Sequence, residues 1–250
     1  MYCPRQTTYI IERGDNLYQI ARHYQTTVRD ILTLNSNVDP YNLQIGSELI
    51  ICPGENYQPK PETPDSPACP DASKLLTLTN EMRLRWSQHV YWTRLLIVSI
   101  AERLGDLDAT TRRLMRNPGD IADIFARYYP PQAAVRIAQL LTEHLQIGAE
   151  LITALRDGDT AKAQTLNAQW YANADQMADA FSGISPYYGR QAMREMLYRH
   201  LDLTKQEVAM RLSRNYTADT KAFDAVEEEA MVMADMFTSG IIRQFPQMFS

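Results

Sequence analysis

The sequence predicts a small α+β domain followed by an all-α helical bundle made of three αα-hairpin repeats. Residues 8–52 combine β-rich ends with two short amphipathic segments, and residues 54–73 are rich in proline and polar side chains. Beyond them, a pattern of about 55 residues recurs three times. We therefore expect a first domain over residues 1–53, a linker over 54–73 and a helical bundle over 74–250.

Composition narrows the classes of partner. The chain has 250 residues and a formal net charge of −5, which gives no electrostatic reason to bind nucleic acid or anionic lipid. The longest strongly apolar run, residues 95–100, is far shorter than the roughly 20 residues that a membrane-spanning helix needs. Met1 is not followed by the basic and apolar segments of a secretory signal. We expect no membrane span, no nucleic acid and no signal peptide.

The first domain is predicted to run strand, helix, helix, strand. Thr8 to Ile11 is β-rich, and Asp15 is a suitable N-cap for a helix that follows the turn at Gly14. Thr27 is placed to cap a second helix, and Leu49 to Ile51 reads as the closing strand.

Three segments in this domain resemble a known family: "GDNLYQIA" at 14–21, "ILTLN" at 31–35 and "IGSELII" at 45–51. Residues 8–52 as a whole resemble the LysM domain, a βααβ module that binds N-acetylglucosamine-containing glycans such as peptidoglycan and chitin. The resemblance implies a shallow sugar groove between the first strand–helix loop and the loop before the last strand. The residues so implied are Gly14, Asp15, Asn16, Leu17, Asp39, Pro40, Tyr41, Asn42 and Leu43.

In that groove, exposed backbone groups would hold an acetamido group, and Leu17 and Tyr41 would supply apolar cover. The alternative for Gly14, Asp15 and Asn35 is that they form only turns and helix caps, and the two roles are compatible.

The three cysteines leave two possibilities open. Cys3 and Cys52 flank the first domain, and Cys69 lies in the linker. If the two end strands are antiparallel neighbours, Cys3 and Cys52 can form a disulfide that would matter in an oxidising setting. The alternative is three free thiols in a reducing cytosol. Their spacing matches no metal motif.

From residue 74 onward, every long segment has a helical pattern. We predict helices near 74–104, 108–127, 132–156, 160–182, 187–213 and 216–243. Within each predicted hairpin, a histidine is followed 34 or 35 residues later by an aspartate. The histidines are His89, His144 and His200, and the aspartates are Asp123, Asp179 and Asp235.

The histidines are candidate metal ligands. His144 lies in the middle of an apolar stripe, so we expect it to point into the core, and His89 and His200 occupy equivalent positions. Three neutral imidazoles that meet near one axis would suit Zn or another transition metal and leave a fourth coordination position open. The three aspartates would then hydrogen-bond to the histidines or serve as further ligands.

Two alternatives compete with this metal site. A His–Asp hydrogen bond inside each hairpin would satisfy a buried imidazole without any metal. A ferritin-like di-iron site would require Glu-x-x-His, but the residues three before the histidines are Trp86, Leu141 and Leu197.

The helical part resembles an uncharacterised family of spore-forming bacteria whose members are often labelled acetylglutamate kinase. The resemblance rests on "HVYWTR" at 89–94, "RNPGD" at 116–120, "WYANAD" at 170–175 and "GIIRQFP" at 240–246. Kinase activity is not expected, because residues 75–250 contain neither predicted strands nor a Gly-rich phosphate loop followed by lysine.

Together these patterns predict a protein of the spore coat or cell envelope that binds peptidoglycan or a chitin-like glycan. Its helical domain would be a cargo or assembly module that contacts spore-coat proteins or further copies of itself. The alternative is a metal-binding helical bundle, or a metalloenzyme, tethered to glycan through the first domain.

Overall fold

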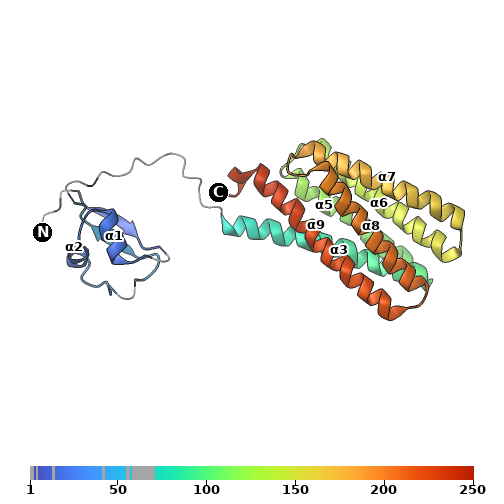
Figure 1. Ribbon diagram of the computed structural model, residues 1–250, viewed down its shortest axis with the longest axis horizontal. Coiled ribbons are helices and arrows are strands. Elements are labelled where there is room, and N and C mark those ends of the chain that lie inside the picture. The colour runs from blue at the N-terminus through green and yellow to red at the C-terminus, as the bar shows by residue number, and fades with distance from the viewer. Residues whose placement is uncertain (1–2, 4, 13–14, 41–42, 55–56, 58–70) are drawn as a thin grey trace. The chain divides into compact units, whose positions relative to one another are not determined.

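The computed structural model describes residues 3, 5–12, 15–40, 43–54, 57 and 71–250. The chain forms two compact units, residues 1–66 and 67–250 (Figure 1). The predicted fold class is confirmed: a small two-stranded α+β unit precedes an all-helical one. Most of the predicted linker, together with Cys69, lies outside the described residues.

The first unit contains strand β1 (Thr7–Ile10), helices α1 (Leu17–His23) and α2 (Val28–Leu34), and strand β2 (Glu48–Ile51). The two strands are antiparallel, with Tyr9 opposite Leu49. Thr27 caps α2 as predicted, but the N-cap of α1 is Asn16 rather than Asp15. The Asn16 side chain accepts from the Gln19 N–H, which satisfies one of the free donors at the start of the helix.

The small core is formed by apolar side chains from both helices, from β2 and from the residue that follows β1. They are Ile11, Leu17, Ile20, Ala21, Ile31, Leu49 and Ile51. The buried Asn35 ties α2 to β2, since its side chain accepts from the Ile50 N–H and donates to the Ile50 carbonyl. A disulfide joins Cys3 to Cys52, so the first of the two possibilities for these cysteines is the one formed.

The second unit contains long helices joined by short turns. They are α3 (Ala72–Ala101), α4 (Leu107–Leu114), α5 (Asn117–Ala126), α6 (Pro131–Asp157), α7 (Thr160–Ile184), α8 (Arg190–Leu212) and α9 (Tyr216–Gln244), with a 3-10 turn η1 (Pro246–Met248) at the end. Helices α6 and α7 pack together as one pair and α8 and α9 as another, while α3 lies along α9 (Figure 1). Among the described residues, no helix has both the length and the apolar character needed to span a bilayer.

One predicted helix is in fact two. The sequence suggested a continuous helix over 108–127, but α4 ends at Leu114 and α5 begins at Asn117. Pro118 explains the break, because proline has no N–H to donate and its ring clashes with the carbonyl four residues earlier, which is that of Leu114. The break places Asn117 at the first turn of α5, fully buried.

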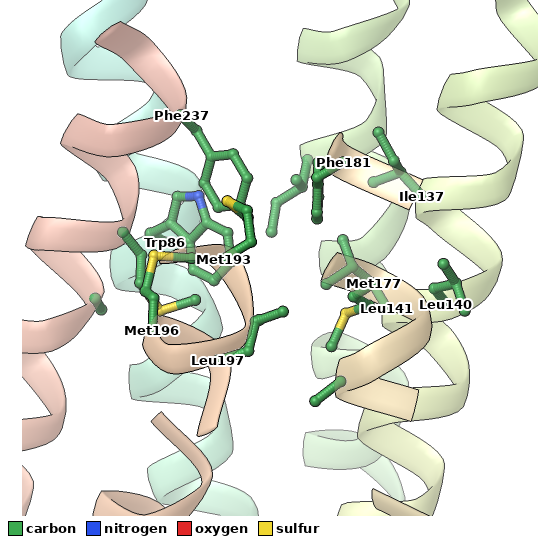
Figure 2. Packing of buried hydrophobic residues seen from close by; sticks show 14 of the residues in the cluster. Trp86, Ile137, Leu140, Leu141, Met177, Phe181, Met193, Met196, Leu197 and Phe237 are labelled. Carbon is green, nitrogen blue, oxygen red and sulfur yellow. The ribbon is translucent and has the colours of Figure 1, made fainter. Parts of the chain in front are cut away.

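Most of the buried apolar side chains of the bundle form one large core (Figure 2), and a smaller separate cluster includes Leu96, Leu145 and Ile152. Trp86 of α3 stacks on Phe237 of α9, with ring centroids 5.3 Å apart. Phe181 of α7 packs against the same Phe237 ring at 4.6 Å. These contacts hold α3, α7 and α9 in fixed register, and α3 carries the first of the candidate histidines.

Candidate functional site

The three histidines come together inside the bundle. His89 on α3, His144 on α6 and His200 on α8 are 2–4% exposed, and one ligand nitrogen from each lies within 4.8 Å of the others. Their ring centroids are 5.8–6.1 Å apart. The sequence placed them on inward faces, and the packing of α3, α6 and α8 brings those faces to one point. We call His89, His144 and His200 the histidine triad.

Asn117 fixes the tautomer of the first histidine. Its Nδ2 donates to the Arg85 carbonyl at 2.8 Å, which leaves its Oδ1 facing Nδ1 of His89 at 2.9 Å. Because that oxygen can only accept, Nδ1 of His89 carries the proton and Nε2 keeps its lone pair. In metal sites, a ligating histidine usually donates the N–H of its other ring nitrogen to an acceptor in the same way.

Asn173 holds the equivalent position beside the second histidine and repeats one of these two bonds. Its Nδ2 donates to the Leu140 carbonyl, which belongs to the residue four before His144, just as Arg85 lies four before His89. Its Oδ1 and Nδ1 of His144 are both buried and form no hydrogen bond of good geometry within the described part of the chain. Burial has the larger effect on the pKa of His144 and lowers it, but Asn173 nevertheless lies close enough that its side chain acts against burial and raises that pKa. The Trp170 indole donates to the His144 carbonyl at 3.0 Å and its ring packs on the imidazole.

The third histidine has different support. Glu229 stands at the same 56-residue spacing as Asn117 and Asn173, but its carboxylate accepts from Arg199 at 2.7 Å instead of facing His200. Within the described residues, Nδ1 of His200 has no hydrogen-bond partner. The three histidines are therefore arranged with nearly threefold symmetry, but the side chains that hold them differ from one histidine to the next.

Burial keeps the triad neutral. Desolvation lowers the pKa of His89 and outweighs the opposing effect of the hydrogen bond that His89 donates to Asn117. Desolvation and then the neighbouring imidazoles hold the pKa of His144 well below its usual range. The pKa of His200 falls to about 3 for the same two reasons, burial and then His89. Neutral imidazoles are the form that binds a metal ion.

The aspartates singled out by the sequence do not reach the histidines. Asp179 pairs with Arg190 and Asp235 with Arg83, all with side chains about half exposed, and Asp123 is exposed as well. Each lies six residues after Asn117, Asn173 or Glu229, and six residues at 100° each turn a helix side chain by 240°. Both their expected role as histidine partners and the His–Asp alternative are therefore wrong.

A second buried polar group links α3, α8 and α9. The Arg94 guanidinium donates to Glu207 at 2.9 Å and to both oxygens of Asp219, and Arg211 also donates to Asp219. Glu207 and Asp219 are essentially inaccessible to solvent. Burial raises the pKa of Glu207 to about 7 against the opposing effect of Arg94. Sequence reasoning missed this group, because Arg94 is 113 residues from Glu207 and 125 residues from Asp219 in the sequence.

In the first unit, the structure describes part of the implied sugar groove. The Asp15 carboxylate accepts from the Tyr9 hydroxyl at 2.7 Å and from the Glu12 N–H, so it braces the loop between β1 and α1. Asp39 and Pro40 are exposed, and Leu43 packs against the small core. Gly14, Tyr41 and Asn42 lie outside the described residues.

Leu17 does not offer apolar cover to a ligand. It is 3% exposed, because Leu17, Ile20 and Ala21 form the inward face of α1. The next residue, Tyr18, points outward and is 70% exposed. The exposed aromatic side chain beside this loop is therefore Tyr18, which sequence reasoning passed over because it sought apolar residues at the loop itself.

A two-stranded antiparallel sheet that carries two short helices, with loops braced at its edge, defines a small βααβ module. The family model described as LysM domain matches residues 9–51 of this module. The match confirms the resemblance found in the sequence and supports binding to peptidoglycan or another N-acetylglucosamine-containing glycan. No curated protein and no solved structure gives a significant match to the chain.

Proposed function

We propose that the protein attaches to peptidoglycan-type glycan of the spore coat or cell envelope through residues 9–51, and that the helical unit is the module held there. The LysM match to these residues carries the proposal. The braced loop at Asp15 and the exposed Tyr18 support it, because sugar sites combine fixed polar groups with an aromatic surface.

Glycan pull-down tests this attachment. Purified peptidoglycan and chitin should retain the full chain, and deletion of residues 1–60 should abolish retention. Tyr18→Ala should weaken it several-fold, while Tyr91→Ala, at an exposed tyrosine on α3, serves as the matched control. Retention of the truncated chain at the level of the full chain would show that attachment does not use the first unit.

A second candidate function concerns the helical unit, which we propose binds one transition-metal ion at the histidine triad. The carrying observation is that three buried, neutral imidazoles place ligand nitrogens within 4.8 Å of one another. A tetrahedral ion about 2.0–2.1 Å from each nitrogen would need nitrogens roughly 3.4 Å apart. Inward movement of the rings by about 1 Å achieves this.

The chemistry of the donor set favours a borderline ion such as Zn²⁺, Co²⁺ or Cu²⁺ over Mg²⁺ or Ca²⁺, which prefer oxygen ligands. No carboxylate or thiolate belongs to the group of ligand atoms found in the described residues. The ion would therefore bring an uncompensated double charge into the core, which favours an anionic or polar fourth ligand.

Metal content and thermal stability test the triad. Untagged full-length protein should bind one Zn²⁺ per chain, and Zn²⁺ should raise its melting temperature, because a ligand that binds only the folded state stabilises it. His200→Ala should lose both effects, whereas His23→Ala, at an exposed histidine of α1, should keep them. A folded His200→Ala variant that still binds Zn²⁺ as tightly as the parent would rule out the triad as the site.

A further inference from the structure

A small cavity adjoins the histidine triad on one side. Its volume is about 20 Å³, and all three histidines line it. Thr93, Gly148 and Thr204 also line it, and each lies four residues after a triad histidine. The cavity therefore lies one helical turn toward the C-terminal ends of α3, α6 and α8. On the opposite side, Trp86, Leu141 and Leu197 belong to the large apolar core.

Two hydroxyl groups border this cavity. Thr204 Oγ1 donates its hydrogen to the His200 carbonyl at 2.9 Å, so toward the cavity it can only accept. Thr93 Oγ1 is buried and has no hydrogen-bond partner in the part of the chain that the structure describes. A buried hydroxyl left unpaired costs about 1–3 kcal/mol. A ligand in the cavity that both donates and accepts hydrogen bonds would satisfy both groups.

The size and walls of the cavity restrict that ligand. A cavity needs roughly 10–15 Å³ of this kind of volume to hold one water molecule. The rest of the lining is largely apolar, including Leu96, Leu114, Leu145 and Ile152, all of which are buried. Such walls offer no further polar contacts and leave no room for a side chain or a larger anion.

We propose that the metal ion at the histidine triad completes its coordination with one water molecule or hydroxide, held in this cavity by Thr93 and Thr204. The proposal rests on the second candidate function above. It gives the ion an exogenous ligand in place of a fourth protein ligand, and hydroxide would offset part of the buried charge. Thr93 and Thr204 are positioning residues, since they act through the bound water.

The first experiment detects the bound oxygen directly. The full chain is loaded with Cu²⁺ and transferred to water enriched in the magnetic oxygen isotope, and its electron–nuclear double-resonance spectrum is recorded. We expect hyperfine coupling from one directly bound oxygen. A loaded protein without that coupling would overturn the proposal while leaving the metal site intact. A protein that binds no metal at all would instead overturn the second candidate function.

Variants test the two hydroxyls. Thr93→Val combined with Thr204→Val keeps the side-chain volume, and we expect it to lower Zn²⁺ affinity at least tenfold, as for other groups that support metal ligands. Thr142→Val is the matched control, since Thr142 makes the same bond to the carbonyl four residues earlier but does not line the cavity. Equal affinities in the double variant and the parent would contradict the role of the hydroxyls.

A size test completes the design. Azide should leave the visible spectrum of the Co²⁺-loaded parent unchanged, because the cavity holds only one water-sized group. Leu96→Ala removes part of the wall, and azide should then change the spectrum. Azide binding to the parent as readily as to Leu96→Ala would show that the fourth position is not enclosed in this cavity.

Discussion

Nδ1 of His89 donates to Oδ1 of Asn117 at 2.9 Å, and the other end of the same amide donates to the Arg85 carbonyl one turn before His89. The two bonds lock the amide and the imidazole in one arrangement. They turn the lone pair of Nε2 away from Asn117, which makes this nitrogen the one available to an ion. The position of Asn117 at the start of α5 thus decides which nitrogen of His89 can bind a metal.

Asn117→Ala should therefore weaken Zn²⁺ binding. Without its acceptor, Nδ1 of His89 loses the bond that fixes its tautomer, and loss of such a partner usually lowers metal affinity 10–100-fold. Competition against a chromophoric chelator measures the change. Asn173→Ala should weaken binding less, because Asn173 holds the equivalent place beside His144 without a well-formed hydrogen bond to its Nδ1.

The matched control replaces the aspartates that recur at the same spacing. Asp123→Asn, Asp179→Asn and Asp235→Asn together should leave Zn²⁺ affinity within twofold of the parent, because these side chains are exposed and two of them pair with arginines. Weaker Zn²⁺ binding in this triple variant than in Asn117→Ala would show that the aspartates, and not Asn117, support the histidine triad.

The repeat in the sequence predicts one part of this site correctly and another part wrongly. The apolar stripe around His144 correctly placed the histidines inward, and their even spacing correctly suggested equivalent positions. The aspartates have the same spacing, but periodicity shows only that positions are equivalent, and gives no indication of which face of the returning helix they occupy. Asn117 and Asn173 recur as well, yet Glu229 at the third position hid the pattern.

The sequence also could not show that three separate inward faces meet. That outcome depends on how α3, α6 and α8 pack, and this packing is set by large side chains such as Trp86 and Phe237 from distant segments. For the first unit, local signals predicted the order of strands and helices, because all of these elements lie within residues 7–51. The exposure of Tyr18 was missed because it depends on the orientation of α1, which buries Leu17, Ile20 and Ala21 and so turns Tyr18 outward.

Glu207 should make stability depend on pH. Burial raises its pKa from an ordinary 4.5 to about 7, so between these values the folded state binds a proton that the unfolded state releases. The free energy of unfolding should therefore fall as pH rises from about 5 to 7, by up to about 1.4 kcal/mol per pH unit. The buried histidines have lowered pKa values and act in the opposite direction.

Comparison with Glu207→Gln isolates this contribution, since the histidines are the same in both chains. Urea unfolding at pH 5, 6 and 7 should show the stability of the variant rising relative to the parent as pH increases. Glu228→Gln, at an exposed position of α9, should follow the parent. A parent and Glu207→Gln that differ by a constant amount at all three pH values would mean that Glu207 is charged throughout.

Gly240 marks a close approach between α9 and Tyr188. A Cβ at this position would lie 2.0 Å from a ring carbon of Tyr188, whose ring is fully buried and whose hydroxyl donates to the Phe237 carbonyl. Gly240→Ala should therefore destabilise the bundle by about 3 kcal/mol or more, at the upper end of overpacking costs. Chemical denaturation of the helical unit provides the measurement.

Gly183→Ala is the matched control in α7. Among the residues that the structure describes, nothing lies within 4 Å of a Cβ at Gly183, so alanine there should stabilise the helix by up to about 1 kcal/mol. If Gly240→Ala lowers the free energy of unfolding and Gly183→Ala raises it, the loss at Gly240 comes from the clash with the Tyr188 ring. A Gly240→Ala variant as stable as the parent would show that Tyr188 has another position available.

The disulfide between Cys3 and Cys52 should stabilise the first unit alone. The bridged residues are 49 apart in sequence, and closing a loop of this size removes unfolded-state freedom worth about 4 kcal/mol in the chain-entropy description. In a Cys69→Ser background, which prevents exchange with the third thiol, calorimetry should show two transitions. A reductant should lower the transition of residues 1–66 and leave that of the helical unit in place, because the two units have separate cores.

Cys3→Ser combined with Cys52→Ser should reproduce the lowered transition and remove its response to reductant. Glycan retention by this variant should then fall at temperatures where the reduced first unit unfolds, while Zn²⁺ binding by the helical unit persists. If the reductant lowered both transitions equally, the two units would unfold together, and the separation of glycan attachment from the histidine triad would be wrong.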